Sequence, residues 1–129
     1  MRTSAQLAGD AAEARVEQAL SAAGWTILGR HVRVSRSEID ILAVDPGPPS
    51  ALVAVEVRWR SRRDFGLPEE TVDRRKVRRL QRAVLLLVEA RRLPDGTALP
   101  RFPVRVDLVA ADIDRRGAVT TRHHRAIGA

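Results

Sequence analysis

The sequence predicts an α/β domain in which a mixed β-sheet is flanked by helices, with the element order α-β-β-β-α-β. Three observations lead to this expectation. An alanine-rich segment without proline opens the chain, three apolar strand-like segments follow it closely, and a long amphipathic segment separates the third of these from a fourth. A chain of 129 residues, 44% of them hydrophobic, is long enough for one buried core. We therefore expect a single domain over 1–129, with its core over about 5–112 and a C-terminal strand or tail over 113–129.

Local signals define the first helix and a hairpin. Residues 5–23 are rich in alanine, contain no proline and precede Gly24, which predicts a helix that stops at the glycine. Two strands are expected next, at 25–34 and 38–44, because both segments are rich in β-branched and other apolar residues. The link between them is so short that we expect an antiparallel hairpin.

The remaining elements surround the long amphipathic segment. A proline-rich turn separates the hairpin from a third strand at 51–60. From about 69 to 92 apolar residues recur at helical spacing, which predicts a second helix that crosses over the sheet. A fourth strand is expected at 102–111, and the tail at 118–127 offers a candidate for a fifth.

The chain is strongly basic, with 23 Lys and Arg residues against 16 Asp and Glu residues and a net charge of +7. Such a charge favours a polyanionic partner, and nucleic acid is the main candidate. The alternative is compositional, because Lys76 is the single lysine and a GC-rich genome favours arginine codons in the same way. Aromatic residues make up 3% of the chain, so recognition of the phosphate backbone is a better expectation than stacking on bases.

Several classes of protein are excluded by what the sequence lacks. There is no cysteine, which excludes a disulfide framework and a thiolate metal site. No apolar run approaches the roughly 20 residues that span a membrane, and the N-terminus has no hydrophobic signal core. We therefore expect a cytoplasmic protein with no membrane partner.

Two acidic side chains stand in strand positions where acids are disfavoured. Side chains alternate along a strand, so Glu56 and Arg58 share a face of the third strand, while Asp40 lies in the middle of the second. If the strands are neighbours, Asp40 and Glu56 approach each other, and carboxylates about 4 Å apart repel by roughly 4 kcal/mol at an effective dielectric of 20. A divalent cation removes that repulsion, and oxygen ligands suit Mg²⁺ or Mn²⁺. The alternative is an ordinary Glu56–Arg58 ion pair on a solvated face.

A third acid, Glu13, lies on the inner face of the first helix. At 100° per residue it falls about 60° from Val16 and about 20° from Leu20, two apolar residues of that face. An inward glutamate on a helix that covers the sheet could complete a metal site with Asp40 and Glu56. The alternative is that Glu13 pairs with an arginine or extends its carboxylate to solvent.

A basic segment follows the third strand, and over 58–82 basic residues far outnumber acidic ones. Cations beside an acidic metal pocket suit a phosphodiester substrate, because they hold the backbone while a metal ion acts on one phosphate. The alternative is an ordinary solvated helix face. The candidate nucleic-acid-binding residues are Arg60, Arg62, Arg63, Arg75, Lys76, Arg78, Arg79 and Arg82.

Three further polar residues lie near the C-terminus. Asp107 falls in the fourth strand, and the pattern leaves open whether it is structural or neighbours the acidic pocket. His123 and His124 are adjacent, so in a strand they point in opposite directions, which argues against a shared metal ion.

Taken together, these motifs resemble a known family. An acid on the first helix, then "SEID", "VEV" before a basic residue, "DFGLPEETV" before a basic helix, and "VRVDLVA" are similar to the YraN-type family of predicted endonucleases. The similarity runs from about Ala12 to Asp112. It implies the PD-(D/E)XK fold, which is restriction-endonuclease-like, and a relationship to archaeal Holliday-junction resolvases.

The resemblance also implies roles for individual residues. Glu13 matches the family's helix acid, with Ala12 in the place of a usual glycine. Asp40 matches the metal-binding aspartate, with Ser37 in the place of another glycine. Glu56 matches the acid of the E-x-K motif.

Arg58 departs from the family pattern, because it stands where that motif has lysine. Arginine cannot act as a base at any relevant pH, although it can donate hydrogen bonds to a transition state. The base would then be a hydroxide on the metal or a substrate phosphate. The leading expectation is a Mg²⁺- or Mn²⁺-dependent endodeoxyribonuclease that acts on branched or linear DNA. Its catalytic residues would be Glu13, Asp40, Glu56 and Arg58. The alternatives are a nucleic-acid-binding module with a vestigial site, and a scaffold that forms a homodimer through an apolar face.

Overall fold

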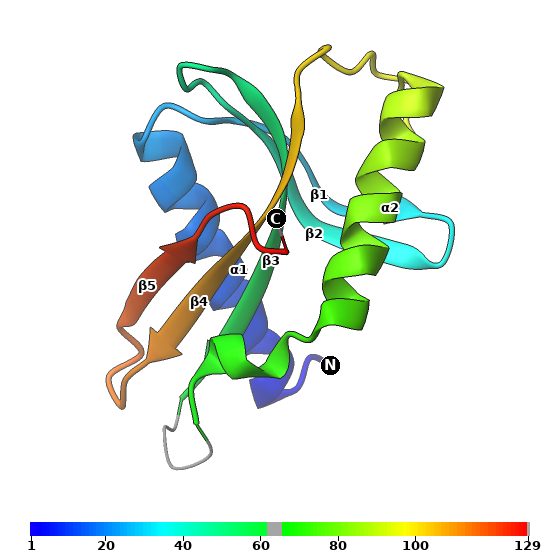
Figure 1. Ribbon diagram of the computed structural model, residues 1–129. Helices are drawn as coiled ribbons and strands as arrows, with labels where there is room; N and C mark the ends of the chain where they lie inside the picture. The colour runs from blue at the N-terminus through cyan, green and yellow to red at the C-terminus, as the bar shows by residue number, and fades with distance from the viewer. Residues whose placement is uncertain (62–65, 129) are drawn as a thin grey trace.

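The computed structural model describes residues 1–61 and 66–128, and it shows a five-stranded sheet with one long helix on each face (Figure 1). Its elements are α1 (Ser4–Ala22), β1 (Thr26–Val34), β2 (Ser37–Asp45), β3 (Ala51–Arg60), the 3₁₀ turn η1 (Pro68–Thr71), α2 (Arg74–Ala90), β4 (Val104–Ile113) and β5 (Val119–His124). The predicted order α-β-β-β-α-β is confirmed, and the tail adds the fifth strand. Neither helix of the described ranges is long and apolar enough to cross a lipid bilayer.

The strands lie in the sheet in chain order, from β1 at one edge to β5 at the other. The predicted hairpin of β1 and β2 is confirmed as antiparallel. β3 and β4 run parallel, and the crossover between them passes through η1 and α2. Residues 51–57 of β3 are all buried, as expected for a central strand covered on both faces. Glu56 is therefore an acid among the otherwise apolar buried residues of β3.

The alternation along β3 divides the interior into two cores. Odd-numbered residues of 53–57 pack against α1, for example against Leu20. On the opposite face Leu52 packs against α2 through Leu80 and Val84. A fully buried Leu or Val side chain contributes about 1.5–3 kcal/mol to stability, so both helices are held mainly by these contacts.

The prediction of the second helix, at 69–92, is wrong at its first turns. Residues 68–71 form the separate turn η1, and α2 begins only after Asp73. The Asp73 carboxylate accepts the backbone N–H of Lys76 at 2.9 Å and so caps the helix. The helix ends before Arg91, whose backbone is left-handed with φ 60°.

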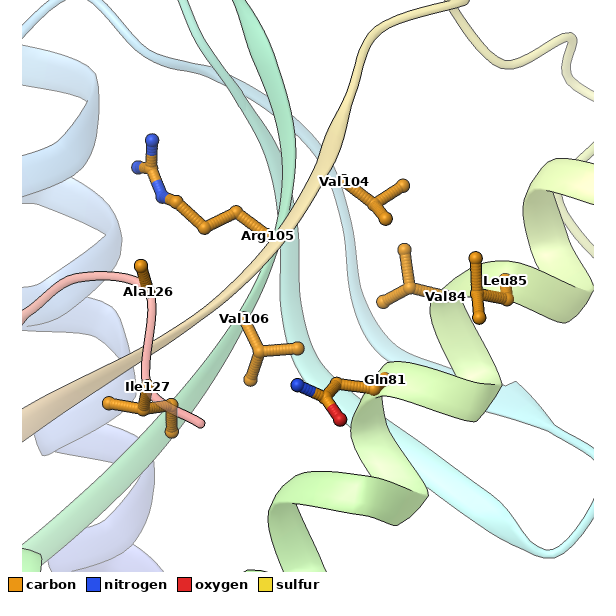
Figure 2. Close-up of a pocket in the computed structure, with 8 residues that line it drawn as sticks. All are labelled: Gln81, Val84, Leu85, Val104, Arg105, Val106, Ala126 and Ile127. Carbon is orange, nitrogen blue, oxygen red and sulfur yellow. The ribbon is translucent and has the colours of Figure 1, made fainter. Parts of the chain in front are cut away.

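A buried polar cluster lies on the α1 face of β4. Asp107 is 0% exposed and accepts two hydrogen bonds from Arg105, at 2.8 and 2.9 Å. Two more come from His123 Nε2 at 2.8 Å and from the Ala126 N–H at 2.9 Å. Arg105 also donates to Asp45 at 2.8 Å, and Figure 2 shows its side chain directed away from α2. The cluster ties the C-terminal tail and the three strands β2, β4 and β5 together, so Asp107 has a structural role.

Candidate active site

The backbone pairing of β2 with β3 stops one residue short of Asp40. The ladder ends with the pair Ile41 and Val55, and we call the gap beyond that pair the β2–β3 fork. At the fork the Oδ2 atom of Asp40, rather than a backbone carbonyl, accepts the N–H of Val57 at 2.9 Å. The carboxyl group is thereby fixed between the two strands.

Glu56 lies beside Asp40 on the α2 face of the sheet, and its side chain is only 4% exposed. Its Oε2 atom is buried and accepts no hydrogen bond from a described residue. Burial raises the pKa of Asp40 to about 8, and the hydrogen bond and charge of Glu56 act in the same direction. The raised pKa favours a proton on Asp40 in this buried pair at neutral pH. A divalent cation fits such a pair because it can displace the proton and bind both carboxylates.

Glu13 reaches the fork from α1. Its Oε2 atom accepts a hydrogen bond from Arg30 Nη2 at 2.9 Å and lies 2.8 Å from His31 Nε2. An oxygen of Glu13, a ring nitrogen of His31 and an oxygen of Asp40 lie within 4.8 Å of one another. Asp40 is thus the shared neighbour of the other two acids: it lies near Glu13, which comes from α1, and beside Glu56, which lies on the α2 face. Arg30 also neutralises the Glu13 carboxylate, as in the alternative expectation that Glu13 pairs with an arginine.

His31 is a residue of this site that the sequence analysis missed. It lies in β1 between Arg30 and Val32, whose partners in β2 flank Asp40, and its backbone has φ 50°. Its Nδ1 atom lies 2.8 Å from Glu38 Oε1, and this hydrogen bond raises the pKa of His31. Each ring nitrogen faces a carboxylate, which favours the protonated ring. A left-handed residue breaks the alternation of a strand, so no periodic signal in the sequence marks it.

Two cations converge on the buried Oε2 atom of Glu56. Lys76 Nζ lies 3.3 Å away, and Arg58 Nη2 lies 3.7 Å away. Arg58 shares the face of Glu56, and its buried Nε atom has no hydrogen-bond partner among the described residues. Lys76 comes from the first turn of α2. The sequence assigned Lys76 to a nucleic-acid surface, whereas the structure directs its ammonium group at the carboxylates.

The basic surface of α2 begins in the same turn as Lys76. A shallow depression of about 430 Å³ is lined by Arg74, Arg75, Arg78, Arg79 and Arg82. None of these five forms an ion pair with another described residue, so their charges are available to a polyanion. Arg74 is an addition to the predicted set, and Arg60 ends β3. The candidates Arg62 and Arg63 lie outside the described residues.

Glu69 holds η1 on the sheet. Its carboxylate oxygens accept hydrogen bonds from Arg122 Nη2 at 2.7 Å and Nε at 2.9 Å, and His124 Nε2 lies 2.9 Å from Oε2. The hydrogen bonds from Arg122 are the main reason why the pKa of Glu69 is lowered to about 2. Arg122 and His124 belong to β5, so this contact fixes η1, and with it the start of α2. The adjacent His123 turns to the opposite face and contacts Asp107.

A pocket of about 370 Å³, lined mainly by apolar side chains, lies between α2 and β4 (Figure 2). Val84 and Leu85 line it from α2, Val104 and Val106 from β4, and Ile127 from the tail. None of the predicted site residues is among those that line it. Leu85 is 52% exposed and Val104 37% exposed, and formation of a homodimer through such an apolar face stays a prediction.

Most of the chain matches one protein family. The family model of the "Uncharacterised protein family UPF0102" matches residues 12–111. A UPF0102 protein of Symbiobacterium thermophilum is 38% identical over 114 residues, which cover 88% of this chain and 89% of that protein. A second one, of Moorella thermoacetica, is 36% identical over 111 residues, which cover 86% and 85%.

Among solved structures, SfsA of Pyrococcus furiosus in complex with Ca²⁺ is similar at a TM-score of 0.40 and 16% identity. The match covers 94% of this chain and 63% of that one. The sequence matches by themselves show which family the chain belongs to. This chain belongs to family UPF0102, the YraN-type family of PD-(D/E)XK-like, nuclease-related proteins.

Proposed function

We propose that the protein is a Mg²⁺- or Mn²⁺-dependent nuclease that hydrolyses DNA phosphodiester bonds at the β2–β3 fork. The observation that carries this proposal is the buried Oε2 atom of Glu56, which accepts no hydrogen bond from a described residue. It lies beside Asp40, whose pKa is raised to about 8. A buried pair of acids is costly unless its charge is compensated. Lys76 and Arg58, at 3.3 and 3.7 Å from Glu56, compensate it in part, and a divalent cation would compensate it further. Membership of a nuclease-like family supports the proposal.

The acids and the arginines would have separate tasks. Asp40 and Glu56 would hold the metal ion through carboxylate oxygens, which Mg²⁺ and Mn²⁺ prefer as ligands. Glu13 would join them once Arg30 and His31 release its carboxylate. A bound divalent ion supplies a Lewis acid that polarises the phosphate and lowers the pKa of the attacking water. The arginines of α2, which form no ion pair with another described residue, would hold flanking phosphates by charge-assisted hydrogen bonds.

Each cleavage consumes one water molecule. The water oxygen forms a bond to phosphorus as the bond from phosphorus to one sugar oxygen breaks. The proton that water loses passes to solvent or to a neighbouring phosphate, and the sugar oxygen leaves as a hydroxyl group. The products are one strand that ends in phosphate and one that ends in hydroxyl.

A nucleic-acid-binding module with a vestigial site is the second candidate function, and two observations favour it. Arg58 stands where the family motif has lysine. Glu13 is already neutralised by Arg30 and His31, so a metal ion must compete for it. Such a module would bind DNA through α2, and divalent ions would change neither its stability nor the DNA.

The metal site is tested by Glu56→Gln. At about ten times its Kd, a metal ion bound only by the folded state raises the free energy of unfolding by about 1.4 kcal/mol. We expect Mn²⁺ to stabilise the wild type in thermal melts, and to support cleavage of supercoiled plasmid or a four-way DNA junction. Glu56→Gln should remove the stabilisation and slow cleavage on the order of 100-fold.

The matched control is Glu89→Gln, which changes the same functional group at an exposed position of α2. It should behave as the wild type in both assays. A wild-type protein that binds DNA but shows neither metal-induced stabilisation nor cleavage would favour the binding module instead.

The basic surface is tested by the dependence of DNA affinity on salt. Each phosphate contact that is lost lowers the slope of log affinity against log salt concentration by about one. We expect this change for Arg79→Gln, measured by fluorescence anisotropy with a labelled duplex. Arg101→Gln removes an exposed arginine from the segment before β4, at the far end of the sheet, and should leave the slope unchanged. If Arg79→Gln and Arg101→Gln have the same slope, α2 is not part of the proposed interface.

A further inference from the structure

Among the described residues, the cation nearest to the buried Glu56 carboxylate is Lys76 of α2 and not Arg58 of β3. We infer that Lys76 acts at the phosphate under attack, where its ammonium group neutralises the charge that develops on the phosphoryl oxygens. The inference rests on the proposed function and adds a residue to it. It moves Lys76 from the DNA-binding surface into the reaction site, and it leaves Arg58 as a secondary cation.

Lys76 has the position that such a role requires. Its Nζ atom lies 3.3 Å from Glu56 Oε2, and its side chain is 30% exposed, so the ammonium lies where the buried acids meet solvent. Its charge also lowers the pKa of Asp40, although burial and Glu56 raise that pKa by more. A phosphate that enters from solvent therefore meets this ammonium next to both acids.

The start of α2 is built to hold Lys76 in place. Asp73 caps the helix by accepting the Lys76 N–H, which fixes the backbone from which the side chain extends. One turn upstream, Glu69 of η1 is held by Arg122 of β5 through two hydrogen bonds. The backbone at Lys76 is therefore fixed to the sheet through these contacts and is not a free helix end.

Arg58 is less suited to this task. Its Nη2 atom is farther from Glu56, at 3.7 Å, and its Nε donor is buried without a hydrogen-bond partner among the described residues. A guanidinium group is a planar fork, whereas an ammonium group is a compact charge with three rotatable donors. The composition supports the same distinction, because Lys76 is the single lysine among 23 basic residues. A chain that uses arginine at every other basic position retains lysine where the carboxylates lie.

The role is electrostatic. The water oxygen bonds to phosphorus, the bond to the leaving sugar oxygen breaks, and the proton from water passes to solvent or a phosphate. The ammonium neither gives nor takes a proton. Loss of one preorganised donor of this kind slows an enzyme by roughly 100- to 1,000-fold.

The test compares Lys76→Met with the double variant Lys76→Met, Arg58→Lys, using Mn²⁺ and a supercoiled plasmid. Lys76→Met should lower kcat on the order of 100-fold with little change in KM, and it should keep the metal-induced stabilisation. Arg58→Lys in that background returns an ammonium to the site from β3, and it should restore kcat at least about tenfold. Arg79→Gln, a DNA-surface variant, should instead raise KM and leave kcat unchanged.

The outcomes separate this inference from the proposed function. If the wild type cleaves and Lys76→Met raises KM alone, Lys76 is a DNA contact and the inference is wrong. A loss of kcat that Arg58→Lys does not relieve also overturns it. If the wild type cleaves nothing although Mn²⁺ stabilises it, the proposed function fails and takes this role with it. Thermal melts of every variant show that each one is folded.

Discussion

Asp40→Asn is expected to make the metal-free protein more stable than the wild type by about 2 kcal/mol at pH 8.5. The folded-state pKa of Asp40, about 8, lies above its ordinary value of 3.8, so the folded protein binds an extra proton. Wild-type stability therefore falls as pH rises from about 4 through about 8. Asparagine resembles the protonated carboxyl, and its amide oxygen can still accept the N–H of Val57. The variant should lose none of this stability.

The measurement is urea unfolding in EDTA at pH 5 and pH 8.5. The advantage of Asp40→Asn should be small at pH 5 and should grow toward pH 8.5. Addition of Mn²⁺ should reverse the order, because the variant has lost a metal ligand. Asp10→Asn changes an exposed aspartate and should follow the wild type at both pH values. A variant that is less stable than the wild type at pH 8.5 would show that Asp40 is an ordinary ionised strand residue.

Asp107→Asn is expected to lower the free energy of unfolding by about 3–5 kcal/mol, the largest loss of stability predicted for this chain. The amide cannot accept the four hydrogen bonds that reach Asp107, and it leaves Arg105 with Asp45 as its acidic partner. Although burial raises it, hydrogen bonds from His123, Arg105 and Ala126 hold the pKa of Asp107 at about 2. The wild type should therefore keep this stability above pH 4 and lose it as pH falls through 2.

Urea unfolding at pH 7 measures the effect through the midpoint concentration. The slope with denaturant should stay the same, because the folded state remains equally compact. Asp10→Asn again serves as the control and should shift the midpoint little. A loss below about 1 kcal/mol would mean that the cluster around Asp107 contributes little beyond a surface ion pair.

The sequence predicts the fold well where a strand is buried on both faces of the sheet. β3 spans the predicted residues 51–60, because a strand covered on both faces is a mainly apolar run, here interrupted by Glu56 and the arginines at its end. α1 begins and ends one residue before the predicted bounds of 5–23, since Thr3 caps it and Gly24 follows it. The proximity of Asp40 and Glu56 also follows from alternation and strand order.

The remaining features depend on contacts that are distant in sequence. The fourth strand lies at 104–113 rather than 102–111, after Pro103, which cannot donate to a ladder. The direction of Lys76 depends on where η1 is anchored, and that anchor is a residue of β5. The placement of His31 depends on a left-handed backbone that no propensity indicates. Periodicity identifies faces of elements, but it does not show which side chains meet across them.

The exchange of a carboxylate for a carbonyl at the β2–β3 fork has an evolutionary consequence. Asp40 serves the backbone of Val57 as well as the proposed metal site, so a lineage without that site still needs an acceptor there. Drift toward asparagine would keep that acceptor and relieve the cost of a buried charge, whereas alanine would leave an amide without a partner. Degenerate descendants should therefore carry asparagine at this position more often than any apolar residue.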